Sequence, residues 1–293
     1  MLGSALVPQL EASGHEVTAT DIDLGSGRVG GVDLQHLDVR IPEQVDNWMD
    51  RIRPELVVHL AAHTDLELCE RDRDDAWRTN ALGTKHVALA CRRRGTQLAY
   101  ISTAGVFDGT KQEPYIEFDA PSPINTYGAS KYQGELFVQR LVPESYTVRA
   151  GWMVGGGAKD HKFVAKILKQ VMDGATTLHA VGDKFGTPTY ARDFAECFGR
   201  LILSQSYGLY HMASIGACSR FDVTRKIVSL LDRSDIEVVE VTSDFFSVEY
   251  FADRPRSETM RNLVLDLQGM NTMRNWEVAL EDYLVTDFPE MMR

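Results

Sequence analysis

The chain has 293 residues, of which 44% are hydrophobic and 25% charged, as in a globular protein with one large core or two unequal ones. Its formal net charge of −11 argues against a general nucleic-acid-binding protein, which needs a basic face to neutralise phosphates. No apolar run approaches the roughly 18 residues of a membrane-spanning helix, so we expect no membrane partner. The cysteines Cys69, Cys91, Cys197 and Cys218 lack metal-ligand spacing. We therefore expect a cytoplasmic protein without a metal site.

Strand-like apolar runs alternate with helical patterns through about residue 155. This alternation is typical of an α/β protein whose parallel sheet carries helices on both faces. The run from Leu56 to Ala62 is apolar almost throughout, as expected of a strand buried on both sides. We predict a Rossmann-type doubly wound parallel sheet with strands near 15–21, 34–39, 56–62, 97–103 and 146–154. The predicted helices lie near 2–13, 42–53, 74–94 and 125–142.

The spacing of the elements loosens after three consecutive glycines, Gly155 to Gly157. We predict a smaller α+β lobe there, with helices near 162–172, 192–204, 220–231 and 276–283 and strands near 177–181, 208–213 and 237–241. The predicted division places residues 1–155 in the sheet domain and 156–293 mainly in the smaller lobe. Residues from about 190 to 215 are expected to return to the main sheet.

The N-terminus departs from the pattern of a dinucleotide-binding sheet, which opens with a strand, a Gly-rich turn and a helix. Gly3 reads as the last glycine of that turn, and Asp21 as the carboxylate that accepts ribose hydroxyls. The alternative is an amphipathic surface helix followed by an acidic strand end, and these two residues alone do not decide. On the first interpretation the first strand is truncated and a central sheet position is empty or filled in another way. Either the true start then lies upstream, or the chain binds its cofactor poorly.

Tyr127 and Lys131 lie four residues apart in a predicted helix and therefore share one face. Thr103 ends the predicted strand 97–103 and adds a hydroxyl. Together these groups can give a proton to, or take one from, a carbonyl or alcohol beside a nicotinamide ring. A lone Tyr-x-x-x-Lys pair is common on surface helices, so its surroundings must support it.

Several motifs in order resemble the extended short-chain dehydrogenase/reductases, and within them the dTDP-4-dehydrorhamnose reductase-like family. The resemblance spans nearly the whole chain, which makes it more specific than any single motif. Its motifs are Leu-Asp-Val at 37–39, His-Leu-Ala-Ala-His-Thr at 59–64, Thr-Asn-Ala-Leu-Gly-Thr at 79–84, Ile-Ser-Thr at 101–103, Val-Phe-Asp-Gly at 106–109, Tyr-Gly-Ala-Ser-Lys at 127–131, Arg-Ala-Gly-Trp at 149–152, Gly-Thr-Pro-Thr-Tyr at 186–190, Asp-Phe-Ala at 193–195, Gly-Leu-Tyr-His at 208–211 and Arg-Pro-Arg at 254–256.

The resemblance implies three catalytic residues. Tyr127 would be the general acid in the reducing direction, and Lys131 would favour its ionised form and bond the nicotinamide ribose. Thr103 would hold the substrate oxygen, with Ser102 close by. Asn80 is expected to bond a helix or order water rather than donate a proton.

The resemblance also implies two binding sets. The cofactor set is Gly3, Asp21, Asp38, Val39, Ala61, Ala62, Tyr127 and Lys131. The substrate set is Ser102, Thr103, Trp152, Arg254 and Arg256, in which the arginines would contact phosphates. A core tryptophan and a solvated arginine pair remain alternatives. Ala104 and Gly105 stand where the family usually has Asp-Tyr, which leaves the particular sugar open.

The sequence therefore predicts an NAD(P)H-dependent reductase of a nucleotide-linked 4-keto sugar. NAD(H) is the favoured cofactor, because Asp21 would repel a 2′-phosphate, with NADP(H) possible. We expect a nucleotide-linked sugar as substrate, no nucleic-acid partner and possible homodimer formation. One alternative is an epimerase or dehydratase of the same superfamily. Another is a non-catalytic nucleotide-binding regulatory subunit, although a complete set of Thr103, Tyr127 and Lys131 weighs against it.

Overall fold

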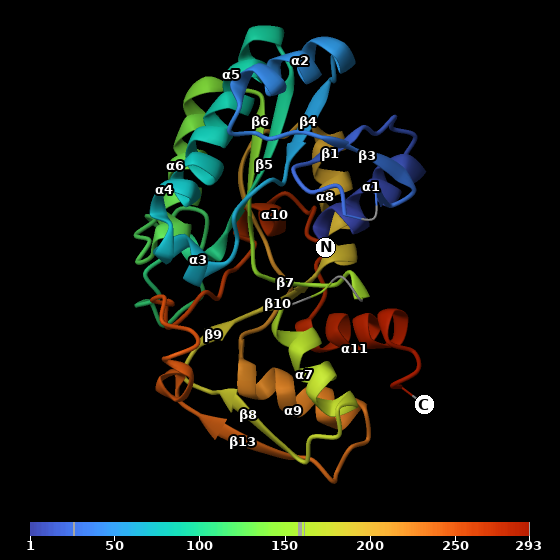
Figure 1. Ribbon diagram of the computed structural model, residues 1–293, viewed down its shortest axis with the longest axis vertical. Coiled ribbons are helices and arrows are strands. Elements are labelled where there is room, and N and C mark those ends of the chain that lie inside the picture. Colours follow the sequence, from blue (N-terminus) through green and yellow to red (C-terminus); the bar gives the residue numbers. More distant parts are fainter. Residues whose placement is uncertain (26, 158–159, 161, 293) are drawn as a thin grey trace.

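The centre of the molecule is a parallel sheet of four strands in the order β11-β6-β5-β4 (Figure 1). The computed structural model describes residues 1–25, 27–157, 160 and 162–292. All neighbouring strands of this sheet run parallel. Their bounds are β4 Leu56–His59, β5 Gln97–Thr103, β6 Ser145–Ala150 and β11 Gly208–Met212. Since β11 pairs with β6, a segment beyond the three glycines completes the main sheet.

Helices cover both faces of this sheet, because successive side chains of a strand point to opposite sides (Figure 1). On β5, Leu98 and Tyr100 join one buried apolar cluster, whereas Ala99 and Ile101 join another. The prediction of an α/β parallel sheet is thus confirmed. The helices on the first face are α2 Pro42–Ile52, α5 Thr84–Arg94 and α6 Thr126–Leu141. Those on the second face are α1 Leu2–Ala12 and α8 Ala191–Ser204.

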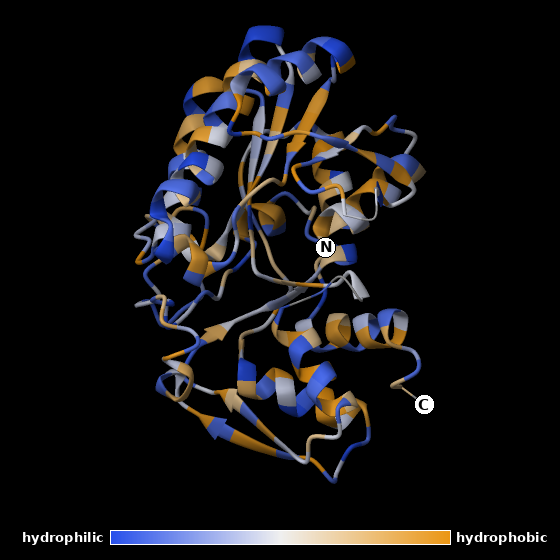
Figure 2. Cartoon of the chain, viewed as in Figure 1, coloured by the Kyte–Doolittle hydropathy of each residue, from blue (hydrophilic) through white to orange (hydrophobic). Residues whose placement is uncertain are grey.

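A second sheet lies beside the first but does not pair with it. Its strands, in the order β1-β3-β2, are β1 Ala19–Asp21, β3 Val32–His36 and β2 Arg28–Val29. β1 ends this sheet and β4 ends the main sheet, and among the described residues no strand joins the two edges. The gap between β1 and β4, which we call the slot, is lined by apolar side chains of both strands and of α1 and α2. β4 is coloured as hydrophobic along most of its length (Figure 2).

In the smaller lobe three helices and a two-stranded parallel sheet share one apolar cluster (Figure 1). These elements are α7 Phe163–Met172, β8 Thr177–Val181, α9 Arg220–Leu230, β13 Glu237–Val241 and α11 Trp276–Asp287. Short strand pairs connect the lobes: β7 Trp152–Val154 with β10 Pro188–Tyr190, and β9 Phe185–Gly186 with β12 Cys218–Ser219. Further elements are α10 Leu263–Leu267, η2 Ala104–Val106 and η4 Ser243–Phe246.

The predicted helix 74–94 was wrong as a single regular element. It is divided into α4 Arg73–Ala76, a π-helical segment η1 Trp77–Gly83 and α5. The wider π turn surrounds Asn80, whose amide bonds the backbone of His63 and the hydroxyl of Ser130. A preceding helix, α3 Leu66–Arg71, was not predicted. No helix in the part of the chain that the structure describes is long and apolar enough to cross a membrane.

Candidate active site

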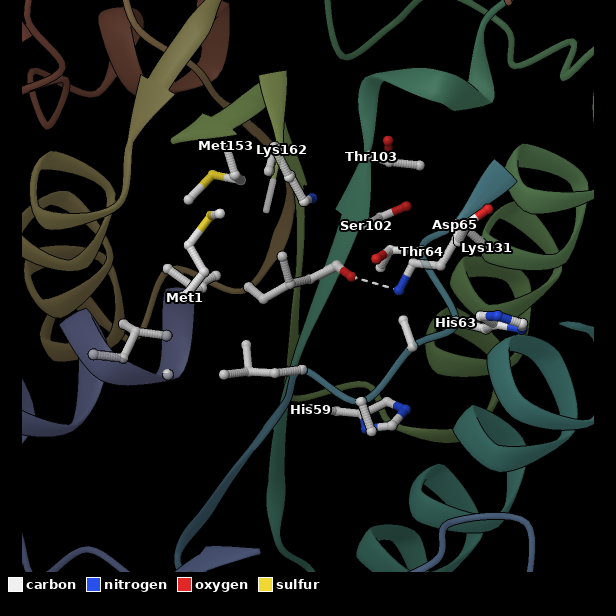
Figure 3. A pocket seen from close by; sticks show the side chains of 18 of the residues that line it. Met1, His59, His63, Thr64, Asp65, Ser102, Thr103, Lys131, Met153 and Lys162 are labelled. Atoms are coloured by element: carbon white, nitrogen blue, oxygen red, sulfur yellow. Dashed lines mark hydrogen bonds between the residues drawn. The ribbon is translucent and has the colours of Figure 1, made fainter. Parts of the chain in front are cut away.

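A cavity of about 2760 Å³ opens at the carboxyl ends of β4 and β5 and continues into the slot. Ligand sites of parallel α/β sheets lie at this edge. A single small-molecule site usually measures roughly 300–1,000 Å³, so the volume here is large enough for more than one such ligand. Figure 3 shows Ser102, Thr103 and Lys131 on one wall and Met1 on the opposite wall.

Thr103 and Tyr127 meet because helix α6 approaches the end of β5 very closely. A Cβ atom at Gly128 would collide with the carbonyl oxygen of Gly105, so only glycine permits this contact. Asn125 fixes the start of the helix, because its side-chain oxygen accepts a hydrogen bond from the Gly128 N–H at 2.7 Å. Tyr127 consequently forms a side-chain hydrogen bond with Thr103.

The two ionisable groups of α6 are shifted in opposite directions. Burial raises the pKa of Tyr127 to about 12, while its hydrogen bond with Thr103 acts in the lowering direction. Burial lowers the pKa of Lys131 to about 7, and the nearby charge of Glu135 opposes this shift. The Lys131 ammonium donates to the Ile101 carbonyl oxygen at 2.7 Å, shown as a dashed line in Figure 3. At neutral pH Tyr127 is therefore protonated and can donate a proton.

The predicted cofactor residues all line the same cavity. Gly3, Asp21, Asp38, Ala61 and Ala62 contribute to its wall, as do Val39, Tyr127 and Lys131. The expected role of Gly3 differs from what the structure shows. Gly3 was expected to allow close packing of a helix on a strand. A Cβ atom at Gly3 would meet only Leu60 at 3.7 Å and Val29 at 3.8 Å, which is ordinary contact.

Asp38 is bound by a cation of its own chain. Arg40 contacts Asp38 at 2.8 Å and Asp75 at 2.7 Å, and its bond to Asp38 holds the pKa of that carboxyl below its usual value. Asn80 ties the segment after β4 to α6, as described above. These hydrogen bonds agree with the expectation that Asn80 bonds a helix rather than donating a proton.

The predicted substrate residues divide between the cavity and the surface. Ser102 is buried with no hydrogen-bond partner for its hydroxyl among the described residues, and Trp152 lines the cavity. Arg254 lines it too, paired with Glu67 at 2.8 Å. Arg256 is exposed and does not belong to the described lining, so the structure does not bring it to the site.

The lining residues that were not found from the sequence include Lys184, Arg220 and Glu258. The Arg220 guanidinium lies 4.7 Å from the centre of the Trp152 ring, and Glu258 accepts a hydrogen bond from the indole N–H of Trp152 at 2.7 Å. Lys184 and Glu258 lie outside helices and strands, and Arg220 begins helix α9. The periodicity of apolar residues, which predicts helices and strands, does not indicate such residues. Within the described residues, no group of three or more His, Cys, Asp or Glu side chains could hold a metal.

Residues 1–287 match the family described as the RmlD substrate binding domain. The chain belongs to this family. It is 32% identical to dTDP-4-dehydrorhamnose reductase of Streptomyces griseus, over 96% of this chain and 89% of the relative. It is 31% identical to dTDP-4-keto-6-deoxy-D-glucose reductase of Streptomyces niveus, over 96% and 92%.

Solved structures agree with this assignment. A dTDP-4-dehydrorhamnose reductase from Bacillus anthracis str. Ames, in complex with NADP, superimposes with a TM-score of 0.82 at 33% identity, covering 97% of this chain and 96% of that one. The predicted family resemblance and the Rossmann-type fold are therefore confirmed.

Proposed function

We propose that this chain is an NAD(P)H-dependent reductase of a nucleotide-linked 4-keto sugar, of the kind that completes the formation of dTDP-rhamnose. The observation that carries the proposal is the meeting of Thr103 and Tyr127 in a cavity that Lys131 also lines. The family and the names of the two Streptomyces relatives support it. A binding subunit would have no use for a proton donor at this place.

The residues divide the chemistry as follows. Thr103 holds the substrate carbonyl oxygen, and Tyr127 protonates that oxygen as the carbonyl is reduced. The bound nicotinamide supplies the hydride to the keto carbon. Lys131 holds the cofactor ribose and stabilises negative charge on the tyrosine oxygen once the proton has left. Lys131 is buried and Tyr127 half-buried, which limits the access of water that would compete for the proton.

The residues around the cofactor end fit a dinucleotide. The first turn of α1 lines the cavity, and the unpaired N–H groups of a first helical turn are a ready site for a pyrophosphate. Ala61 and Ala62 leave room for close approach, and the buried hydroxyl of Ser102 lacks a partner. We propose NAD(H) as the favoured cofactor with NADP(H) possible, because the exposed Asp21 opposes a 2′-phosphate and Arg40 is engaged by two carboxylates. Fluorescence titration with both dinucleotides tests this preference, and tighter binding of NADPH would contradict it.

The location and assembly belong to the same proposal. The four cysteines are free and buried, which fits the reducing cytoplasm. A homodimer would be detected by sedimentation of the purified protein.

The deciding experiment is turnover of a panel of dTDP-linked 4-keto sugars with NADH and NADPH. Tyr127→Phe keeps the ring and removes only the hydroxyl, so kcat should fall by about 10² or more. Tyr132→Phe, on the same helix and partly buried, is the matched control and should keep its activity. An unchanged kcat in Tyr127→Phe would eliminate this mechanism. Cofactor that remains bound through purification and is reoxidised within each turnover would instead favour the epimerase or dehydratase alternative.

A further inference from the structure

The carboxylate of Glu258 lies at the wall of the cavity, beside the residues of the proton transfer. The Oε1 atom of Glu258 and the Oγ1 atom of Thr103 each lie 3.4 Å from the point where a side chain at Gly105 would begin. Because residue 105 has no side chain, nothing of that residue separates the carboxylate from the hydroxyl. The charge of Glu258 is felt at Tyr127, where it acts to raise the pKa of the phenol.

Glu258 is held in place from two sides. Its backbone N–H donates to the carbonyl oxygen of Phe185 at 2.8 Å, which fixes the segment to strand β9. Its Oε2 atom accepts the indole N–H of Trp152 at 2.7 Å. The Trp152 ring is itself confined between Gly186, where a Cβ would collide with it, and the guanidinium of Arg220. The carboxylate is therefore oriented before any ligand arrives, which lowers the entropic cost of binding.

The second oxygen of this carboxylate keeps its acceptor capacity. Among the described residues no hydrogen bond ends on Oε1. The surrounding charges favour the ionised form, since Arg220, Arg254 and Lys184 all act to lower the pKa of Glu258. Burial outweighs them and raises that pKa above its usual value. A neutral hydrogen-bond donor can therefore bind Oε1 without adding to the three cations already near this carboxylate.

We propose that Glu258 is a specificity-determining residue, whose Oε1 accepts a hydrogen bond from a hydroxyl of the sugar that presents its carbonyl to Thr103 and Tyr127. The inference rests on the proposed function, because it needs a nucleotide-linked sugar in the cavity. The hydroxylated sugar ring is the part of the ligand that would occupy this place. Its carbonyl reaches Thr103 and Tyr127, while a neighbouring hydroxyl reaches the carboxylate of Glu258. The nucleotide lies outside this contact, so Glu258 should contribute to sugar binding alone.

The test measures the part of the affinity that comes from the sugar. Calorimetry compares dTDP with dTDP-L-rhamnose, the stable reduced form, on the full chain and on Glu258→Gln. The glutamine keeps an oxygen for Trp152 but removes the charge. Hydrogen bonds to charged groups contribute roughly 1.5–3 kcal/mol, so affinity for dTDP-L-rhamnose should fall about tenfold or more, with dTDP affinity unchanged. Glu249→Gln, an exposed carboxylate lining the same cavity, is the control and should change neither value.

The outcomes separate the two proposals. A loss confined to dTDP-L-rhamnose supports the role of Glu258. An equal loss for both ligands shows that Glu258 only holds Trp152 and its surroundings, and no loss shows that it does not meet the sugar; both overturn the inference while the proposed function stands. If the unaltered chain binds neither ligand, the proposed function fails and takes this inference with it. Melting curves and tryptophan fluorescence of Glu258→Gln identify a folding defect, and Glu258→Asp then provides the second variant, which keeps the charge but shortens the reach.

Discussion

The continuous sheet and the slot region of this molecule differ in what holds them together. β5 and β6 are buried along most of their length between helices on both faces, and the strands beside them complete a regular parallel sheet. β1 and β3 contain no buried residue, and β1 presents an unpaired edge to the slot. Thr103, Tyr127 and Lys131 all belong to the continuous part.

The difference shows that the proton-transfer group and the dinucleotide end depend on separate parts of the structure. The proton-transfer group is positioned by contacts within the continuous sheet and α6. Its geometry therefore does not require the slot to be filled. The cofactor end depends on α1 and β1, which face the slot. Changes on the two sides should therefore have effects of different size and kind.

The largest effect is expected from Gly128→Ala, which acts on the continuous side. The added methyl group collides with the Gly105 carbonyl oxygen, so α6 must move away from the end of β5. We expect a loss of about 3 kcal/mol or more in the free energy of unfolding and loss of turnover. Urea unfolding and steady-state kinetics measure both. Ala129→Ser, one residue along, is the control; equal effects of the two would show that the close approach is not required.

An added strand tests the slot side. A segment of about ten to fourteen residues, with an apolar strand and a Gly-rich turn, is fused before Met1. Pairing with both edges and burial of apolar side chains should raise the melting temperature by roughly 10 °C and tighten dinucleotide binding. A Gly/Ser segment of the same length should do neither. Equal melting temperatures of the two fusions would mean that the slot does not accept a strand. The slot would then not be an open position in the sheet, and the comparison with the continuous sheet would fail.

The sequence predicted the continuous side better than the slot side, for physical reasons. The strand 97–103 of the main sheet was predicted to the residue, because a parallel strand buried on both faces is a nearly continuous apolar run. The strands 177–181 and 237–241 of the smaller lobe also match the prediction to the residue, although neither is buried along its whole length. Helical spacing placed Tyr127 and Lys131 on one face, and the family resemblance implied their roles. Glu258 could not be found this way, because a backbone bond to Phe185 brings it to the site from a distant segment. The π turn was equally hidden, since it depends on the tertiary partners of Asn80.

A smaller, pH-dependent effect should come from His59 on β4. Burial lowers its pKa to about 3, whereas the unfolded chain has the ordinary value of 6.5. Below pH 6.5 the unfolded state binds a proton that the folded state does not, so stability falls as the pH decreases from about 7 towards 3. The slope is at most about 1.4 kcal/mol per pH unit for one group.

Replacing His59 should remove its contribution to the pH dependence of the free energy of unfolding. His59→Gln, followed by urea unfolding between pH 7 and 5, should show a shallower decline than the unaltered protein. His36→Gln is the control, because the side chain of His36 is exposed on β3 in the slot region. A decline of unchanged steepness in His59→Gln would mean that His59 is protonated in the folded protein.

The smallest effect, and the sharpest use of the comparison, is expected from Gly3→Ala in α1. Gly3 lines the cavity, as does Tyr127 next to Gly128, but a Cβ at Gly3 would make only ordinary contacts with Leu60 and Val29. Alanine is the better helix former, so the chain should become more stable by about 0.5–1 kcal/mol. In the strand-fused protein the same change should be destabilising, since the new backbone would approach α1 where glycine leaves room. Urea unfolding of the four proteins, with and without the strand and the substitution, gives the coupling directly. A stabilisation of equal size in both backgrounds would show that Gly3 does not face a strand in the slot.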